Sequence, residues 1–247
     1  AGGHKVSSAA NITVYGNTVD ATATNAHGLV AVHMAASLYD ASQLTIERNV
    51  GFLASRPYNV VQLLQFSEWI KHGCKVRLAH NFFTAFIRCP RPFVDISGGS
   101  MIAGAVELVN ETYTTSMLEN TCSGDRTPPV AALVVDMPPW SGPDAALNTL
   151  TVSHLTSTIT VLTANDPIPV VPHILLANDV PRTLTLSTIT AKTFANGKAS
   201  SVSCFAALKP LANVSLSSNH FHCELRDARR ALQAFFVRSA LGSEALV

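Results

Sequence analysis

Few residues in this 247-residue chain stand at a spacing that supports chemistry. The sharpest candidate is the pair His220 and His222, because residues two apart on a β-strand share a face, and two imidazoles supply half of a zinc site. No third ligand follows at a useful spacing, so we favour ordinary packing of these histidines over metal binding. The polar stretch 121–125 is similar to the surroundings of a catalytic nucleophile, but no partner base accompanies Cys122.

The sequence contains none of the short signatures that mark common enzymes. Gly-x-Ser-x-Gly, Gly-x-Gly-x-x-Gly, a phosphate-binding loop and His-Glu-x-x-His are all absent. We therefore expect no catalytic residues, no cofactor and no enzymatic activity.

Basic residues gather near the C-terminus, where Arg226, Arg229 and Arg230 follow one another closely. A basic helix can contact phosphates, so these three arginines are candidates for contact with RNA. A solvated helix face is the alternative that we favour.

Three aromatic residues, Trp69, Trp140 and Tyr15, are candidates for a subunit interface. Both tryptophans stand beside chain breakers, where large aromatic side chains serve as core plugs or as interface anchors.

The composition is poor in charge. Charged residues make up 13% of the chain and the formal net charge is +1. No global field therefore steers the chain to nucleic acid or to an acidic substrate. A surface with so little charge favours a subunit of a larger assembly over a free monomer, with a neutral extracellular domain as the alternative.

The five cysteines are odd in number and include no Cys-x-x-Cys pair. They predict buried, reduced thiols and a reducing compartment. Three glycosylation sequons, which begin at Asn11, Asn110 and Asn213, would matter only on a secretory route.

Two strands are expected between residues 74 and 89. Cys74, Val76 and Leu78 alternate with polar positions, and alternation resumes at Phe83 and continues to Cys89, which is the period-two pattern of half-buried strands. The prolines at 90 and 92 lack the N–H that a ladder needs, so the second strand must end there or lie at an edge.

The apolar positions change parity twice in the second half of the chain. Leu150 and Val152 are even, whereas Leu155 and Ile159 are odd. A one-residue slip inverts the faces of a strand, so we predict a bulge or corner near His154, and a second change of the same kind after residue 186.

The remaining segments complete an all-β prediction. Residues 1–28 are expected to form an extended arm, residues 59–70 are compatible with a helix, and residues 227–241 are expected to form a C-terminal helix. We find no internal repeat. About nine short strands with turns every 8–15 residues predict an antiparallel β-sandwich of jelly-roll type over residues 29–225, followed by a helix and tail over 226–247.

The segment 66–92 resembles part of the jelly-roll capsid subunits of picorna-like RNA viruses. It has Trp69-x-x-x-Gly73 before a strand, a short break, a second strand and then Pro90 and Pro92. The resemblance implies a structural protein of the virion that assembles in the host cytoplasm with sibling capsid subunits into an icosahedral shell around RNA. It implies weak genome contacts as well, and leaves the host receptor unknown.

The alternative function is a secreted or cell-surface β-sandwich binding module. The sequons favour this alternative, and the odd number of cysteines speaks against it. The longest uncharged run, residues 145–165, is rich in Thr, Ser and Asn, so we expect a pair of strands there and no membrane span.

Overall fold

The fold is taken from a computed structural model of the whole chain. The structure describes residues 4–6, 9–23, 28–55, 60–71, 73–97, 99, 101–117, 130–136, 148–162, 173–176, 183–196, 202–208, 213–226, 232–238 and 244–245. All regular structure in these ranges is β-strand, and none of it is helix.

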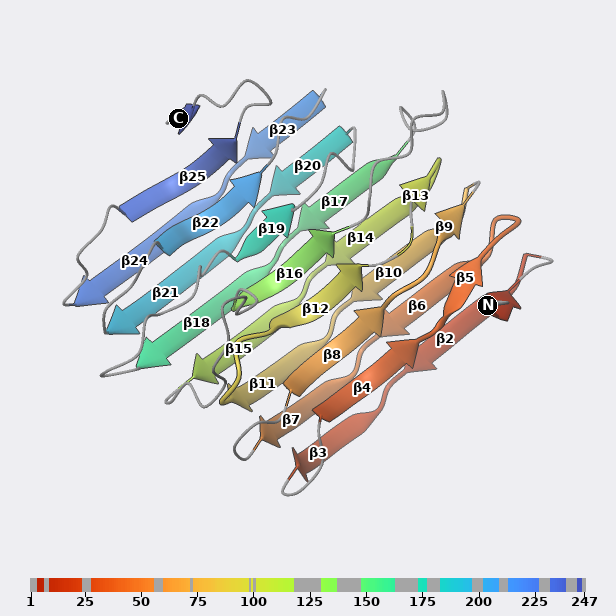
Figure 1. The fold of residues 1–247 in the computed structure, drawn as a ribbon, viewed down its shortest axis with the longest axis horizontal. Helices are drawn as coiled ribbons and strands as arrows, with labels where there is room; N and C mark the ends of the chain where they lie inside the picture. The colour runs from red at the N-terminus through yellow and green to blue at the C-terminus, as the bar shows by residue number, and fades with distance from the viewer. Residues whose placement is uncertain are drawn as a thin grey trace.

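The strands form four sheets, called A to D here (Figure 1). Sheet A is short and contains β1 (His4–Val6), β5 (Ala36–Leu38), β9 (Ile70–Lys71) and β13 (Met101–Ile102). Sheet B has seven strands: β2 (Asn11–Tyr15), β6 (Gln43–Glu47), β10 (Lys75–Ala79), β14 (Ala105–Val109), β17 (Thr149–Ser153), β20 (Thr183–Ser187) and β23 (Asn213–Ser217).

Sheet C also has seven strands: β3 (Thr18–Ala23), β7 (Val50–Ser55), β11 (Phe82–Ile87), β15 (Thr112–Met117), β18 (Thr156–Leu162), β21 (Thr190–Asn196) and β24 (His220–Arg226). Sheet D has eight: β4 (Gly28–Met34), β8 (Val60–Phe66), β12 (Pro92–Ser97), β16 (Ala131–Asp136), β19 (Ile174–Leu176), β22 (Val202–Leu208), β25 (Leu232–Arg238) and β26 (Glu244–Ala245).

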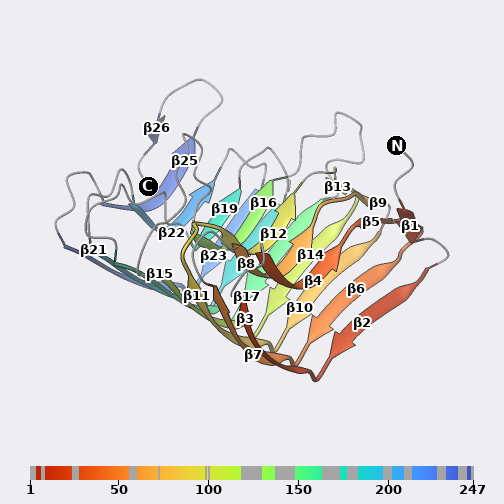
Figure 2. The same ribbon diagram turned by 60° about the horizontal axis from the view of Figure 1, so that its bottom comes forward.

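The chain is a parallel β-solenoid. It visits sheets B, C and D in turn and then returns to sheet B one strand further along, so each strand lies beside its counterpart in the next coil. Every strand pairing among the described residues is parallel except that of β26 with β25. Figure 2 shows sheets B and C as two walls that meet along one edge, with sheet D facing them. The predicted antiparallel jelly-roll sandwich is therefore wrong.

A recurring corner joins sheets B and C. In every coil one residue with positive φ follows the sheet B strand: Gly16, Arg48, His80, Asn110, His154, Thr188 and Ser218. A left-handed residue turns the chain sharply enough to start a second strand after only two residues, although it costs a non-glycine residue about 1–2 kcal/mol. The predicted corner near His154 is confirmed, and so is the change of parity after residue 186, which falls at Thr188.

In the first four coils, the residue after the left-handed position carries side-chain hydrogen bonds that join neighbouring coils at this corner. Asn17, Asn49 and Asn81 recur every 32 residues, and Glu111 follows Asn81 by 30. Each asparagine donates its backbone N–H and its side-chain amide to the side-chain oxygen of the next residue in the series, over 2.9–3.1 Å. We call this series the asparagine ladder. The expectation that the chain has no internal repeat is wrong.

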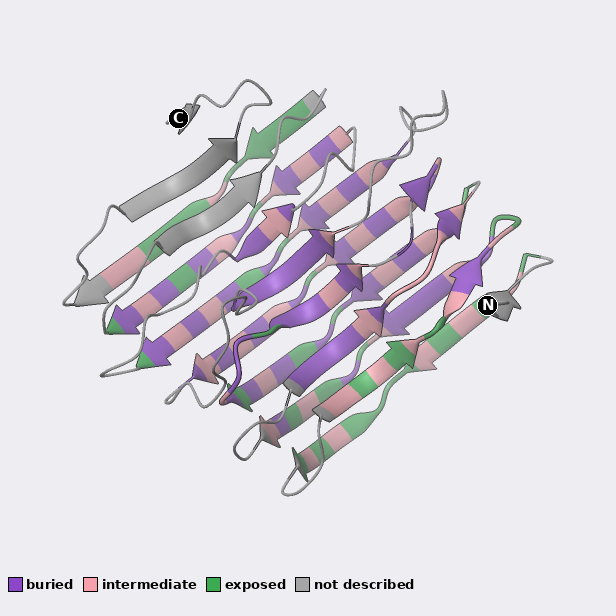
Figure 3. Ribbon diagram, in the orientation of Figure 1, coloured by how far each residue is buried: buried purple, intermediate pink, exposed green. Residues whose placement is uncertain are grey.

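The core consists of apolar columns that run across the strands. Sheet B turns two apolar residues inward in each coil, such as Leu44 and Ile46, and the equivalent residues of the next strand, Val76 and Leu78, lie beside them in register. Figure 3 shows the resulting stripes, with buried positions alternating along β14, β15, β17 and β18, whereas β16 is buried almost throughout. The in-register stacking lets one coil bury the core face of the next, which a lone coil has no means to do.

Three further expectations are corrected by this arrangement. The expected N-terminal arm supplies β1, β2 and β3, which are edge strands of sheets A, B and C. The helix-compatible segment 59–70 contains strand β8, which lies between β4 and β12 and is buried at most of its positions, so its apolar residues do not alternate. The segment 227–241, predicted to be a helix, contains strand β25. The 3.6-residue spacing of its apolar residues therefore does not indicate a helix.

Gly51 fits against a large side chain in the neighbouring coil. It pairs with Phe83, and a Cβ added to Gly51 would lie 2.4 Å from a ring carbon of Phe83 and 2.8 Å from the carbonyl oxygen of Val19. The missing side chain therefore makes room for the ring.

Gly51→Ala is expected to lower the free energy of unfolding by about 1–3 kcal/mol, because the methyl group overpacks this site. Urea denaturation measures the change. Thr84→Ala, at an outward position of β11, is the matched control and should change stability by less than about 0.5 kcal/mol. Equal stability of the Gly51→Ala variant and the parent would contradict the in-register packing of β7 on β11.

Candidate binding face

The outer face of sheet C exposes large apolar side chains at one end. Phe52, Phe82 and Phe86 are 38%, 53% and 39% exposed, and Val50 is exposed beside them. The rings of Phe52 and Phe86 come from neighbouring strands, with centroids 5.6 Å apart and planes tilted by 51°. We call these four residues the aromatic patch. Exposed apolar groups gathered in this way mark interaction sites more often than single exposed residues do.

Hydroxyl groups continue the same face beyond the aromatic patch. The outward positions of β15 and most of those of β18 are filled by threonine and serine, in register between the strands, and Thr190 adds one more hydroxyl on β21. These residues are Thr112, Thr114, Ser116, Thr156, Thr158, Thr160 and Thr190, and all are partly or fully exposed. Because strands lie about 4.8 Å apart, the hydroxyls form rows with a regular spacing.

A shallow hollow at the corner joins these rows. It is lined by Asn110, Thr112, His154, Thr156, Thr188 and Thr190, which are equivalent positions of three successive coils. The corner geometry produces the hollow, since the left-handed residues stand outside the two sheets.

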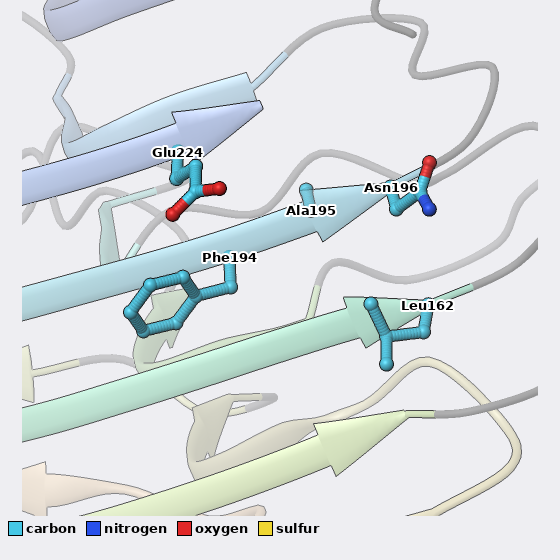
Figure 4. A pocket seen from close by; sticks show the side chains of 5 residues that line it. All are labelled: Leu162, Phe194, Ala195, Asn196 and Glu224. Carbon is cyan, nitrogen blue, oxygen red and sulfur yellow. The ribbon is translucent and has the colours of Figure 1, made fainter. Parts of the chain in front are cut away.

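A second shallow pocket lies at the far end of sheet C. Figure 4 shows Leu162 on β18, Phe194 and Asn196 on β21, and Glu224 on β24 around it. The ring of His222 lies 5.9 Å from that of Phe194 on the neighbouring strand. The pocket is open to solvent. Its lining combines the apolar side chains of Leu162 and Phe194 with the carboxylate of Glu224 and the amide of Asn196.

Sheet B has a different outer face. Lys75 and Arg77 lie 2.7 Å and 3.8 Å from the carboxylate of Glu107, and Arg77 and Arg48 lie 3.6 Å and 3.5 Å from Glu47. The charged side chains of this face therefore pair largely with one another. Sheet C is the better candidate for contact with a ligand.

The interior holds the most strongly perturbed ionisable groups. Glu111 ends the asparagine ladder: its carboxylate accepts two hydrogen bonds from Asn81 and one from the hydroxyl of Tyr113. Burial raises the pKa of Glu111 to about 7, and the hydrogen bonds from Tyr113 and Asn81 act in the opposite direction. Glu111 and Tyr113 are almost completely buried, so they stabilise the coil and do not face a substrate.

His173 is the second buried ionisable group. Its ring nitrogens lie 2.7 Å from the hydroxyl oxygen of Ser157 and 2.8 Å from that of Thr193. Burial lowers the pKa of His173 to about 3, so the ring is neutral and links two strands of sheet C from the inside.

The residues predicted as sites do not come together. His220 and His222 share the outer face of β24, as the spacing predicted, but the described residues contain no cluster of three or more potential metal ligands. Arg226 ends β24, whereas Arg229 and Arg230 lie outside the described residues.

The three interface candidates are also separate. Tyr15 is exposed on sheet B, where its hydroxyl accepts a hydrogen bond of 3.0 Å from Arg48. Trp69 is partly exposed, and the ammonium of Lys71 lies 4.3 Å from the centre of its ring. Trp140 and the polar stretch 121–125 lie outside the described residues.

The prediction of buried, reduced thiols is confirmed for one described cysteine and is wrong for two. Cys74 is free and buried, but Cys89 and Cys223 are disulfide-bonded. Of the sequon asparagines, Asn11 and Asn110 are exposed at a strand start and at a corner.

Sequence reasoning missed both the asparagine ladder and the rings and hydroxyls on the outer face of sheet C. The signal for the ladder was present, since two alternating apolar residues precede Asn17, Asn49, Asn81 and Asn219 at the same distance. The signal for the face appears only when the outward residues of different coils are aligned.

No family model matches the chain, and neither a curated protein nor a solved structure does. None of the described segments forms a helix long and apolar enough to cross a membrane.

Glu111→Gln is expected to change the pH dependence of stability. Because the folded pKa of Glu111 lies above its usual value of 4.5, its stabilising contribution is complete below about pH 4.5 and is lost as pH rises through about 7. The glutamine variant should gain about 3 kcal/mol on the parent between pH 4.5 and pH 8.

Chemical denaturation at several pH values measures this difference. His173 acts in the opposite direction, since its lowered pKa removes stability as pH falls below about 6.5, but it is common to both proteins and cancels in the comparison. Glu107→Gln on the outer face of sheet B is the matched control. Parallel curves for parent and Glu111→Gln would contradict a buried, ladder-terminating carboxyl group.

Proposed function

We propose that the chain is a non-enzymatic binding module that presents the outer face of sheet C to a neutral, polyhydroxylated ligand such as a glycan. The observation that carries the proposal is the continuous face made by the aromatic patch and the hydroxyl rows. Flat ring faces pack against the apolar faces of sugar rings, and threonine hydroxyls both donate and accept hydrogen bonds.

The electrostatics of the face favour an uncharged ligand. Among the outward residues of sheet C whose burial the structure describes, the charged ones are Asp20 on β3, Lys192 on β21 and Glu224 on β24. Arg226 follows in the outward register of β24. Binding to a nucleic acid draws mainly on clustered positive charge, and the described side chains of this face include Lys192 as their single cation. Threonine is also under-represented among the residues that dominate protein–protein binding.

Two further observations support a place outside the cell. Disulfides such as those of Cys89 and Cys223 persist in oxidising compartments. The exposed asparagines of two sequons stand where glycosylation is sterically possible. These observations correspond to the secreted or cell-surface alternative, with a solenoid in place of the sandwich.

The capsid function stays a competing proposal without a structural argument in its favour. The low charge of the chain still favours an assembly. The expected shell geometry, however, depends on a jelly roll, and the chain does not have that fold. Light scattering would distinguish the two proposals, because a capsid subunit forms closed shells of uniform size.

The binding proposal is tested with an array of neutral oligosaccharides, with sulfated ones beside them. Binding of neutral members is expected, and Phe52→Ala with Phe86→Ala should weaken it by at least about tenfold, or ~1.4 kcal/mol. Tyr15→Ala removes an exposed aromatic ring from sheet B and is the matched control, with little expected effect. Binding of sulfated members only, no binding, or equal binding by all variants would overturn the proposal.

A further inference from the structure

The register of sheet C places two phenylalanine rings in one outward column that crosses four strands (Figure 1). Phe86 on β11 pairs with Ser116 on β15. Ser116 pairs with Thr160 on β18, which pairs in turn with Phe194 on β21. The residue that follows each of these four is buried in the core, so the four side chains themselves point outward. We call the four residues the ring column.

The two rings stand at the two ends of the ring column, with a hydroxyl group on each strand between them. Because neighbouring strands lie about 4.8 Å apart, three strand spacings place the backbones of Phe86 and Phe194 about 14 Å apart. The hydroxyls of Ser116 and Thr160 divide this interval into equal steps. A hexose unit in an extended chain is about as long as one strand spacing, so about four units reach from one ring to the other.

The ring column ends beside the shallow pocket at the far end of sheet C. Phe194 lines this pocket together with Leu162, Asn196 and Glu224 (Figure 4). The amide of Asn196 can donate and accept hydrogen bonds, and the carboxylate of Glu224 can accept them. Sugar hydroxyls take both roles, so the pocket is suited to the last unit of a sugar chain. At the other end of the ring column, the ring of Phe86 is 39% exposed.

The two neighbouring outward columns are less suited to a neutral chain. The column that contains Phe52 also contains Asp20 and Lys192. The column that contains Phe82 continues through threonines to His220, and it has no second phenylalanine on the strands that the structure describes. The ring column therefore differs from both in having an apolar ring on each side of an uncharged hydroxyl pair.

A chain that lay along a strand would have a poorer match in spacing. On β11 it would meet Phe82, Thr84 and Phe86, which are all outward residues. Outward residues of one strand are about 6.6 Å apart, which is longer than one sugar unit. The spacing between strands is the better match, so the face favours a chain that crosses the strands.

We propose that the ligand of sheet C is an unbranched neutral glycan that lies across the strands along the ring column. The C–H face of one sugar ring packs against Phe86, and that of the unit three further along packs against Phe194 at the pocket. The two units between them exchange hydrogen bonds with the hydroxyls of Ser116 and Thr160. This inference rests on the proposed glycan binding, and adds the direction, the shape and the minimum length of the ligand.

Calorimetric titration with a length series tests the proposal. The probes are unbranched oligomers of glucose, mannose, galactose and N-acetylglucosamine, each two to six units long. For a sugar that binds, affinity is expected to rise at least about tenfold between two and four units, and to change less than about threefold beyond four. Equal affinity for two and four units would overturn the proposal, and so would a preference for branched isomers of four units.

Substitutions at the two ends of the ring column test the direction of the chain. Phe194 is not a member of the aromatic patch, and Phe194→Ala is expected to remove most of the gain in affinity between two and four units. Phe82→Ala should have a smaller effect on the four-unit chain than Phe194→Ala. The reverse order would place the chain along β11 and would overturn the proposal.

Thr160→Val tests the hydroxyl in the middle of the ring column. It should weaken binding of the four-unit chain about fivefold, because it removes one hydrogen bond and keeps the shape of the side chain. Thr151→Val, at an outward position of sheet B, is the matched control and should leave affinity unchanged. Circular dichroism verifies that each variant is folded.

The same titrations separate the ring column from the proposed function. If the parent binds neutral glycans and both Phe194→Ala and Thr160→Val bind them equally well, the ring column is wrong and glycan binding by sheet C stands. If the parent binds no neutral glycan, branched or unbranched, both are wrong.

Discussion

The structure depends on the corner between sheets B and C. A left-handed residue stands there at the same position in each coil, and from Asn17 to Glu111 the residue after it carries a side chain that bonds the neighbouring coil, so these coils set one another's register. In the next two coils Leu155 and Ile189 take this position and are buried in the core. A parallel sheet has no hairpin to fix its register, and a one-residue slip would turn the apolar columns outward. The asparagine ladder prevents that slip, because its bonds form only when Asn17, Asn49 and Asn81 are stacked.

Buried polar side chains stabilise the solenoid, whereas the side chains on its outer faces are exposed to solvent. Glu111 ends the ladder with a carboxylate that burial makes sensitive to pH near neutrality, and His173 bridges two strands as a neutral ring. Both are closed to solvent. The outer faces are then free to vary, and sheet B uses charge pairs whereas sheet C presents rings and hydroxyls.

The sequence predicted local β-structure better than topology. Alternation located the strands that hold Val76 and Phe83, and the change of parity located the corner at His154, because these features depend on one strand at a time. Parallel and antiparallel partners leave the same alternation within a strand, so the sandwich prediction had no local signal against it. The sequence of β8 is also compatible with a helix, because burial on both faces removes the strict alternation that marks a half-buried strand. The candidate sites at Trp69, Tyr15 and the arginines failed to converge for a related reason, since their proximity depended on an architecture that the chain does not adopt.

The central claim is that successive coils stack in register, and distances between spin labels test it most directly. A label at Thr13 is combined with a second label at Thr151, Thr185 or Ser215, all in one outward column of sheet B. With strands about 4.8 Å apart, the solenoid predicts backbone separations of about 19, 24 and 29 Å, which rise in equal steps. Separations that do not increase in this order, or that do so in unequal steps, would contradict the in-register solenoid.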